Sequence, residues 1–543
     1  MRTCSRMRCP SGVVAVCANP VTGIRTTRAT RRFWRGRRAC MDLAWYVCCP
    51  GKLRMQATIR SLASDTAVYG VSSVIQRFLT FLLTPLYTNY LTKGEIGDVT
   101  AIYAMIAFVN IVYSLGLEPA YMRFFDRNDA AASTRVFGTA YRIVFLLGLA
   151  VTALTMLFAS PIAASPWLQL QGNASTLVMT AALIPLIDAL ILLPFARLRM
   201  LRKPKRFAML RLFNVVVNVI LNVVLVIVLG WRVQGVLWAG VIASAMTLLL
   251  LMPDILEALR GSFDRAMAID MLRFGLPTVP SNLSSIMVQV ADRPIMLLLM
   301  GNAAVGMYQT NFRLAIPMML VVTVFEYAWK PFYLHHRDDP QAKDLFVRVL
   351  TLFTVGCGIV FLGTSLWMPY IVKLPFIGGR FINPEYWSGL DIVPIILFAY
   401  FFNGVFVNLV AGFHITKRTG YFPIVTGIAA VVSVVATYLL VPVMGIEGAA
   451  WAKVAAYVVS VIAIAIPLSR IYPVRYDVVR VGAAVACAGI IYAVVHALPP
   501  HDTIQIAARL VAIPLYLVVL MAVGVIGVST LRSMLPSRFI QRS

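Results

Sequence analysis

Residues 72–125 decide the fold class, and they read SSVIQRFLTFLLTPLYTNYLTKGEIGDVTAIYAMIAFVNIVYSLGLEPAYMRFF. Two long apolar runs, at 67–90 and 97–117, flank the short polar link LTKGEIG. A helix needs about 20 mostly apolar residues to cross the hydrocarbon core of a bilayer, and each run reaches that length. The stretch therefore predicts two successive membrane-spanning helices joined by a tight connection.

The rest of the chain repeats this pattern. Of its 543 residues, 60% are hydrophobic and only 13% are charged, and the mean hydropathy is +0.82. A soluble globular chain carries about 25% charged residues, so the composition excludes a soluble enzyme, a disordered chain and a disulfide-rich secreted scaffold. We predict an all-α polytopic membrane protein with about fourteen transmembrane helices, at 67–90, 97–117, 136–159, 174–196, 207–229, 233–253, 272–300, 303–326, 344–366, 386–412, 421–442, 446–468, 476–497 and 504–528.

Basic residues alternate between the two sides of the membrane. If residues 56–66 lie in the cytoplasm, the connections after even-numbered helices are cytoplasmic and should hold the excess of Lys and Arg. The connection after the fourth helix carries six basic residues between 197 and 206, whereas the opposite connections together contain only Lys93, Arg232, Lys373 and Arg380. This alternation predicts that both ends of the chain are cytoplasmic.

One predicted helix is unusually long. The run 272–300 contains Pro277 and Pro280. Proline interrupts the backbone hydrogen bonds of a helix, and neighbouring helices allow such breaks at membrane depth. We therefore expect a kink near the start of this helix.

Residues 1–55 differ in composition from the remainder. They contain 12 of the 48 basic residues, a single acid, Asp42, and six of the eight cysteines. They lack the apolar core of a secretory signal. We interpret them as translated upstream sequence before a start at Met55, with an Arg-rich transit peptide or a basic lipid-binding segment as alternatives. Neither a redox compartment nor a metal site follows from these cysteines.

An internal repeat divides the helices into two sets. Aligning Gly97 with Gly306, 209 residues apart, matches LTKGEIGDVTAIYAMI with MGNAAVGMYQTNFRLA, and each segment follows a long helix and opens the next. We expect two six-helix repeats that form two lobes, plus two extra C-terminal helices. The expected boundaries are a basic tail at 1–55, lobes at 56–260 and 261–470, and the last two helices at 471–543. Such repeats are typical of transporters, whose substrate sites lie between the repeats near the bilayer midplane.

Ionisable side chains within the predicted helices are the candidates for function. They are costly at membrane depth and usually face a wet interior. The cations outnumber the carboxylates, and guanidinium groups bind phosphate oxygens in a bidentate way, which predicts a cavity for a phosphate-bearing substrate rather than a cation. The candidate cavity residues are Arg77, Arg142, Asn218, Gln289, Arg293, Arg313 and Lys453, and the candidates for ion coupling are Asp188 and Asp292.

Several of these residues also have a purely structural interpretation. The asparagine ladder of the fifth helix can hydrogen-bond to a neighbouring helix. Asp292 and Arg293 can form an ion pair that fixes their helix, and Arg142 can snorkel to the cytoplasmic surface. Glu326 and Lys330, four residues apart, are expected to pair with each other.

The sequence indicates neither catalysis nor a cofactor. Its connections are too short for a catalytic domain, and it contains neither a Walker A run nor an HExxH motif. The nearest approach to a metal cluster lies in a short basic loop, where we expect a solvated turn: His335, His336, Asp338 and Asp339. We therefore expect a transporter, not an enzyme, with no cofactor, no metal and no nucleic-acid partner.

The stretch 72–125 resembles the opening of the Wzx-type polysaccharide flippases, in the multidrug/oligosaccharidyl-lipid/polysaccharide exporter superfamily. The second half, NLSSIMVQVADRPIMLLLMGNAAVGMYQTNFRLA, resembles the same family. The resemblance covers about residues 60–530 and is poorly specific for the substrate. The matching positions are Arg77, Pro85, Tyr87, Leu91–Gly97, Ser114–Leu117 and Arg123–Phe125 in the first half, and Asp292–Arg293 and Gly306–Tyr308 in the second.

The resemblance implies a function. Such proteins carry undecaprenyl-diphosphate-linked oligosaccharides across the bacterial inner membrane by alternating access, often driven by an ion gradient. For this chain it implies a role in O-antigen, capsule or exopolysaccharide assembly, with membrane lipids and the polymerase and chain-length proteins of the pathway as partners. A multidrug exporter of the same fold, a flippase for the lipid-linked peptidoglycan precursor, and a membrane polymerase or ligase remain alternatives.

Overall fold

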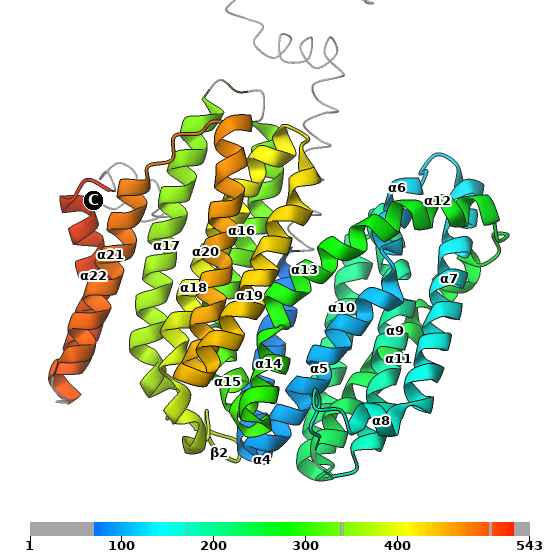
Figure 1. Cartoon of the computed structure of the whole chain (residues 1–543), viewed down its shortest axis with the longest axis horizontal. Coiled ribbons are helices and arrows are strands. Elements are labelled where there is room, and N and C mark those ends of the chain that lie inside the picture. Colours follow the sequence, from blue (N-terminus) through cyan, green and yellow to red (C-terminus); the bar gives the residue numbers. More distant parts are fainter. Residues whose placement is uncertain (1–69, 171, 337–338, 340, 499–501, 526–543) are drawn as a thin grey trace, which may run out of the picture. The chain divides into compact units, whose positions relative to one another are not determined.

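The computed structural model describes residues 70–170, 172–336, 339, 341–498 and 502–525, and these are almost entirely helical (Figure 1). Within this part of the chain the strands are β1, Pro375–Phe376, and β2, Gly379–Arg380, which form one antiparallel hairpin. The prediction of an all-α membrane protein is confirmed. The start expected at Met55 lies outside the described residues.

The first set of helices corresponds to the first predicted repeat. It opens with a helix at residues 70–81. The elements that follow are α4 (Leu83–Tyr90), α5 (Lys93–Ser114), α6 (Leu117–Phe124), α7 (Ala130–Leu157), α8 (Ala159–Ala163), α9 (Ala174–Met200), α10 (Pro204–Asn222), the π-helix η2 (Val223–Val228) and α11 (Arg232–Ala258).

The second set contains more interruptions. Its elements are α12 (Arg265–Gly275), η3 (Leu276–Thr278), α13 (Val279–Val290), α14 (Asp292–Met300), α15 (Asn302–Leu314), α16 (Ile316–His335), α17 (Ala342–Ile371), η4 (Pro384–Gly389), α18 (Ile392–Ile415), η5 (Thr419–Tyr421), α19 (Phe422–Met444) and α20 (Ile446–Ile471). The last two helices are α21 (Val478–Ala497) and α22 (Asp502–Ala522).

Most of the predicted spans have a counterpart in the structure. Among the described residues, 11 helices are long and apolar enough to cross a membrane, and two bent pairs raise the number to 13. The expected first helix, 67–90, begins outside the described residues, and its described part is interrupted at Leu82. A count of about fourteen therefore stays a prediction.

The seventh span is interrupted twice. Near its start the α-helix gives way to the short 3-10 turn η3, which contains Pro277, and further along a 49° bend falls at Ala291, between α13 and α14. The ring of Pro294 explains this position, because it has no N–H to donate and collides with the carbonyl of Val290, four residues earlier. The predicted kink near Pro277 thus stays a prediction, although the helix is interrupted there, and a third proline produces the bend that the sequence did not suggest.

The two glycines that reveal the repeat lie where α5 packs against α15. A Cβ on Gly97 would come 2.0 Å from the carbonyl oxygen of Asn302, and a Cβ on Gly306 would come 2.0 Å from that of Lys93. Because Lys93 and Asn302 are also 209 residues apart, the two contacts are equivalent. Small residues allow helices to approach this closely, and only glycine fits at either position.

The same offset relates two helix breaks. It pairs Pro85 with Pro294, and each is the third residue of its helix, α4 or α14. It also pairs Leu82 with Ala291, the residues at which the two spans are interrupted. The repeat is therefore expressed in the backbone as a proline-induced break in the first span of each half.

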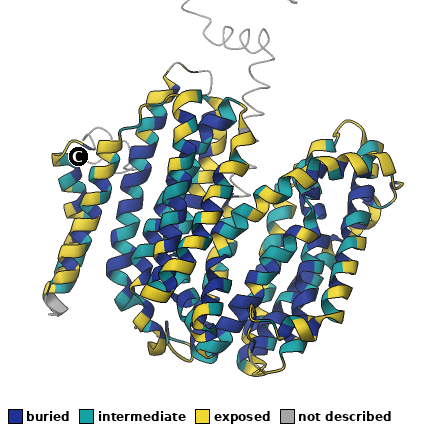
Figure 2. Ribbon diagram, in the orientation of Figure 1, coloured by how far each residue is buried: buried dark blue, intermediate teal, exposed yellow. Residues whose placement is uncertain are grey.

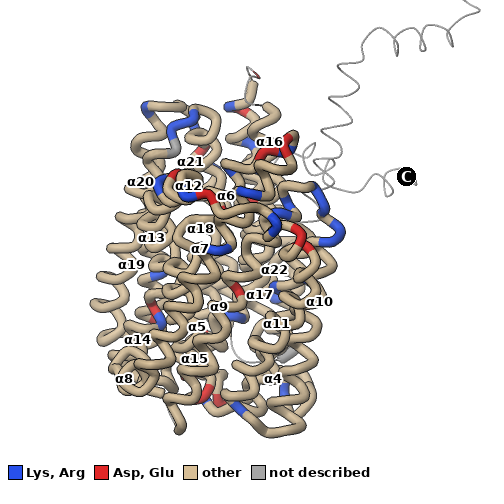
Figure 3. Tube along the Cα trace, turned by 90° about the vertical axis from the view of Figure 1, so that its right-hand side faces the viewer, with Lys and Arg blue, Asp and Glu red and all other residues tan. Residues whose placement is uncertain are grey.

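The remaining helices pack around three long ones. Helices α7, α10 and α11 pack around α9, while α18 and α19 pack on α20, and α21 and α22 lie beside α17 (Figure 1). Large apolar side chains remain exposed along many of these helices (Figure 2), as expected where lipid surrounds them. Charged residues gather mainly towards the ends of the helices, with a few at mid-length (Figure 3).

Candidate functional site

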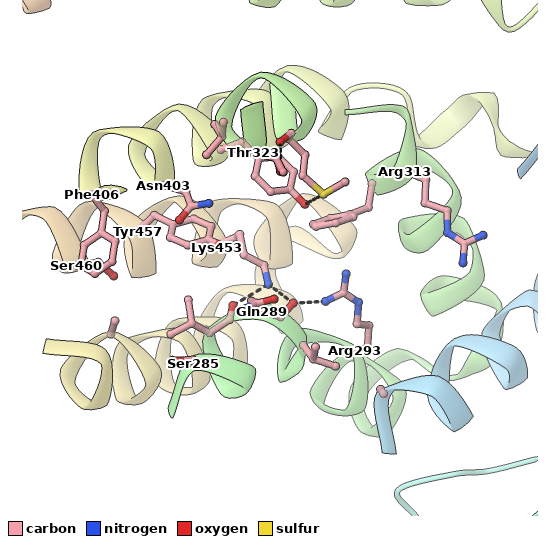
Figure 4. A pocket seen from close by; sticks show the side chains of 18 of the residues that line it. Ser285, Gln289, Arg293, Arg313, Thr323, Asn403, Phe406, Lys453, Tyr457 and Ser460 are labelled. Carbon is pink, nitrogen blue, oxygen red and sulfur yellow. Dashed lines mark hydrogen bonds between the residues drawn. The ribbon is translucent and has the colours of Figure 1, made fainter. Parts of the chain in front are cut away.

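A cavity of about 630 Å³ lies among helices of the second set, with part of its wall formed by α5. Its volume is within the range of ligand sites in proteins. Figure 4 shows polar and charged side chains pointing into it from several helices. Five of the seven predicted cavity residues line it: Arg77, Gln289, Arg293, Arg313 and Lys453.

Behind this wall, Asp292 holds two of the cations. Its carboxylate lies 3.0 Å from the Arg293 Nη1 and 3.0 Å from the Lys453 Nζ, and it accepts a 2.7 Å hydrogen bond from the Tyr308 hydroxyl. Asp292 is only 1% exposed and does not line the cavity itself. The structural interpretation of the Asp292–Arg293 pair is therefore visible in the fold, and Lys453 extends it to α20.

Lys453 is also tied to the bend between α13 and α14. Its ammonium donates to the backbone carbonyls of Val288 and Gln289, both at 2.9 Å (Figure 4). Together with Asp292, these acceptors use all three of its N–H donors. A helix break at membrane depth must satisfy its backbone groups from nearby protein groups, and Lys453 does so here.

One edge of the Arg293 guanidinium group remains available to the cavity. Its Nη1 also donates to the Gln289 carbonyl, its Nε donates to the Gln309 side chain at 3.1 Å, and its guanidinium lies 4.6 Å from the centre of the Phe312 ring. No described residue accepts a hydrogen bond from its Nη2. This group is free to meet a ligand.

Arg77 and Arg313 are less constrained. Arg313 lies 5.9 Å from the centre of the Tyr87 ring. Within the described part of the chain, neither arginine forms an ion pair or a hydrogen bond. Both line the cavity, so their guanidinium groups are available to an anion.

A second cavity, of about 600 Å³, adjoins the first. Both are lined by Arg77, Arg313, Gln309 and Tyr400. The helix at 70–81 contributes several polar residues to its wall. The second cavity also has two cations, from α9 and α10, that were not among the predicted cavity residues: Arg199 and Arg211. Their sequence signal is ambiguous, because Arg199 lies within the basic connection at 197–206 and Arg211 follows it closely, so that both resemble ordinary cytoplasmic charges.

Besides Asp292, three predicted site residues lie outside both cavities. Arg142 donates to the carbonyls of Gly261 and Leu259, at 3.0 and 3.2 Å, and so caps the end of α11. Asn218 accepts a hydrogen bond from Asn222 on its own helix. Asp188 accepts a 3.1 Å hydrogen bond from Ser244 of α11.

Glu326 has a different environment from the one expected. It lines the first cavity. No ion pair joins it to Lys330 among the described residues. Its i,i+4 spacing from Lys330 suggested a local pair, but the cavity keeps the carboxylate exposed.

A family model described as "Polysaccharide biosynthesis protein" matches residues 88–378, which is more than half of the chain. The chain belongs to this family. The match includes α5 to α17 and thus most helices around the two cavities. A comparison with curated protein sequences finds no match.

Solved structures show the same fold as this polysaccharide biosynthesis family member. The lipid II flippase MurJ, in an inward closed conformation, matches with a TM-score of 0.62 and 14% identity, over 83% of this chain and 98% of that one. An inward-facing multidrug resistance MATE transporter of the MOP superfamily gives a TM-score of 0.61 and 16% identity, over 74% and 95%. The MATE transporter DinF-BH, in complex with R6G, gives 0.54 and 18%, over 77% and 96%.

The likeness in fold agrees with the resemblance read from residues 72–125. The family match confirms that the chain is a polysaccharide biosynthesis protein, and these neighbours confirm that it has the fold of the multidrug/oligosaccharidyl-lipid/polysaccharide exporters. At such low identity the neighbours establish the fold alone. What this family member moves must be argued from its own cavity.

Proposed function

We propose that this protein is a flippase that moves undecaprenyl-diphosphate-linked oligosaccharides across the bacterial inner membrane for O-antigen, capsule or exopolysaccharide synthesis. The observation that carries the proposal is that guanidinium N–H groups line the first cavity without an acceptor among the described residues: those of Arg77 and Arg313, and the Nη2 edge of Arg293, whose Nη1 pairs with Asp292. Guanidinium groups match phosphate oxygens in geometry and charge. The family match supports a glycan as the other part of the substrate.

The two halves suit transport by alternating access. We place the lobes at 56–260 and 261–470, with 471–543 as the appended helices and 1–55 as a basic tail. The halves meet at the α5–α15 contact, and the first cavity is lined by both. Movement of one half against the other around this contact would open the cavity to each leaflet in turn.

The two alternatives that share the fold predict different cavities. A multidrug/ion antiporter for organic cations needs carboxylates facing its substrate, whereas four cations and one carboxylate line the first cavity. A peptidoglycan-precursor flippase would also use cations, and the likeness to MurJ favours it at the level of the fold. The family match favours the polysaccharide branch.

Localisation and partners follow from this proposal. The protein would lie in the inner membrane with both termini in the cytoplasm. The polymerase and chain-length proteins of the same pathway would act on its product. Asp188 and Asp292 are the candidates for ion coupling, although Asp292 already neutralises Arg293 and Lys453.

The first test is a chromosomal deletion in the native host, followed by analysis of surface glycan and of lipid-linked repeat units in each leaflet. We expect loss of glycan and accumulation of the repeat unit on the inner leaflet. Unchanged glycan with new drug sensitivity would support the antiporter, and lysis would support the peptidoglycan branch.

The cavity assignment is tested by complementation. Arg313→Gln should reduce transport about 10- to 100-fold, since a charge-assisted hydrogen bond contributes about 1.5–3 kcal/mol. Arg348→Gln, at an exposed position of α17 outside both cavities, is the matched control. Full complementation by Arg313→Gln at normal protein level would refute the assignment.

A further inference from the structure

A third cavity, of about 590 Å³, lies apart from the first two. Its volume is within the range of ligand sites in proteins. It is lined by the starts of α5, α9 and α11, which lie at the same end of the molecule (Figure 1). The proposed orientation places this end outside the cytoplasm, so we call the cavity the outer pocket. Its main residues are Glu95, Asp98, Asn173, Trp231, Arg232 and Gln234.

The charged residues of the outer pocket already have partners. Glu95 lies 2.9 Å from the Arg232 Nε, which joins the start of α5 to that of α11, and it accepts a hydrogen bond from the backbone N–H of Thr92. Asp98 accepts a hydrogen bond from the side chain of Asn302. Two carboxylates and one cation leave a small negative excess, which disfavours an anion. No group of three metal-binding side chains occurs in the described part of the chain.

The uncharged polar groups of the outer pocket are largely unused. Neither the Asn173 amide nor the Thr176 hydroxyl, which also lines the pocket, forms a hydrogen bond with a described residue, although Asn173 occupies the cap position of α9. Gln234 donates to a threonine of α9 at 2.7 Å, which leaves its amide oxygen as an acceptor. The pocket thus offers both donors and acceptors to a polar ligand that carries no charge.

Trp231 adds an apolar surface to the same pocket. It is 48% exposed although it lines the cavity. A tryptophan near the membrane surface usually belongs to the aromatic belt and meets lipid headgroups, whereas this one stands beside amide and hydroxyl groups. A sugar ring has an apolar face and a rim of hydroxyls. A flat aromatic ring next to unused hydrogen-bonding groups matches both of these features.

The outer pocket adjoins the contact between the two halves. Asp98 follows Gly97, the glycine that packs on the Asn302 backbone, and its own carboxylate binds the Asn302 side chain. The α5–α15 contact therefore borders the pocket. The second cavity, by contrast, reaches Arg199 in the basic connection, on the opposite side of the membrane. A ligand in the outer pocket is thus separated from the cavity that faces the cytoplasm.

We propose that the outer pocket binds uncharged sugars of the transported glycan after they have crossed the membrane. This inference rests on the proposed function and adds to it a second glycan site, on the side where the product is released. Trp231 would cover the apolar face of a sugar ring, while Asn173 and Gln234 would hydrogen-bond its hydroxyls. A glycan held there would stay on the outer side while the first and second cavities receive the next cargo.

The experiment titrates the purified full chain, in lipid nanodiscs, with the oligosaccharides that mild acid releases from the lipid-linked material of the native host. These probes carry neither the lipid nor the diphosphate, so they report binding of the glycan alone. We expect saturable binding to the wild type. Trp231→Ala and Asn173→Ala should each weaken it about two- to ten-fold, the value of one aromatic contact or one hydrogen bond. Trp231→Phe, which keeps a flat ring, should retain part of the affinity.

Two control variants locate the binding. Trp167→Ala is the matched control, because Trp167 is 50% exposed, precedes α9 and lines none of the three cavities. It should bind the oligosaccharides as the wild type does. Arg313→Gln should also bind them normally, since we assign Arg313 to the diphosphate. Binding that survives unchanged in Trp231→Ala and Asn173→Ala, or that is lost in Arg313→Gln, would overturn the assignment to the outer pocket.

The outcomes separate this inference from the function on which it rests. If no oligosaccharide binds to the wild type, the inference falls, and the deletion phenotype still decides the flippase proposal. If the deletion leaves surface glycan unchanged, the flippase proposal falls and this inference falls with it. If only the acidic oligosaccharides bind, the choice of uncharged sugars is overturned.

Discussion

Replacement of Asp292 by alanine should destabilise the protein more than any single change to its partners. The carboxylate lies 3.0 Å from each of two cations and accepts the Tyr308 hydrogen bond, and all four side chains are less than 10% exposed. Truncation leaves Arg293 and Lys453 buried side by side without a counter-charge. Removing one partner of a buried ion pair costs about 3–5 kcal/mol, and we expect Asp292→Ala to lie at the upper end.

Lys453→Met provides the comparison, because Asp292 and Arg293 still neutralise each other in that variant. We expect a loss of about 1–3 kcal/mol, the cost of leaving a buried polar group unsatisfied, because the carbonyls of Val288 and Gln289 lose their donor. In the double variant Asp292→Ala/Lys453→Met one of the two orphaned cations is gone. The double variant should therefore lose less stability than the sum of the two single losses, since residues of one network do not act additively.

Thermal unfolding of the purified variants in one detergent, followed by tryptophan fluorescence, ranks the three proteins. Asp292→Asn, which keeps the shape and a polar group, should fall between Asp292→Ala and the wild type. The reasoning fails if Asp292→Ala is as stable as Lys453→Met, or if the two losses simply add in the double variant.

Three other changes test the fold around the cavities. Gly306→Ala places a Cβ against the Lys93 carbonyl and should destabilise the protein by about 1–3 kcal/mol. The control Gly356→Ala has open space around its new Cβ and should not destabilise the protein. Equal unfolding temperatures for the two variants would refute the packing argument. Arg142→Met removes two hydrogen bonds to carbonyls at the end of α11 and should lower the stability by about 1–3 kcal/mol, while each folded molecule transports as before. A loss of transport at normal stability would show that Arg142 acts in the cavity. Pro294→Ala removes the clash that bends the seventh span and should lower transport in complementation assays, and wild-type transport would show that the bend is dispensable.

Much of the fold could be predicted from the sequence because membrane helices are specified by long apolar runs. The pairing of Gly97 with Gly306 could be read directly, and the structure shows why: each glycine faces the backbone of the other repeat, and no other residue fits. The interruption at Pro277 agrees with the predicted place of a kink, whereas the 49° bend at Ala291 was not predicted, because Pro294 lies inside an apolar run. The hydrophobic periodicity of the sequence does not reveal which proline ring will bend the helix by colliding with the carbonyl four residues earlier.

The cavity was harder to predict, because depth along a helix does not say which way a side chain faces. Arg142 and Arg313 are both single arginines in apolar surroundings, yet one caps a helix end and the other lines both cavities. Arg199 and Arg211 line the second cavity. They were not predicted there because, in the sequence, they cannot be distinguished from the basic residues of the cytoplasmic connection. Only packing between helices separates these cases.

The cations of the first cavity thus form two groups, according to whether groups of the protein already compensate their charge. In lipid, a break such as that between α13 and α14 exposes carbonyls that only protein groups can satisfy, and Lys453 and Arg293 donate to them while Asp292 neutralises the pair. Stabilising the break is therefore their first role. Arg77 and Arg313 have no such role among the described residues, although an insertion cost of about 2.5–3.5 kcal/mol applies to each. Their presence is explained if water and an anionic cargo surround them, which is why a variant of Arg313 should fold and fail to transport, whereas a variant of Asp292 should fail at folding itself.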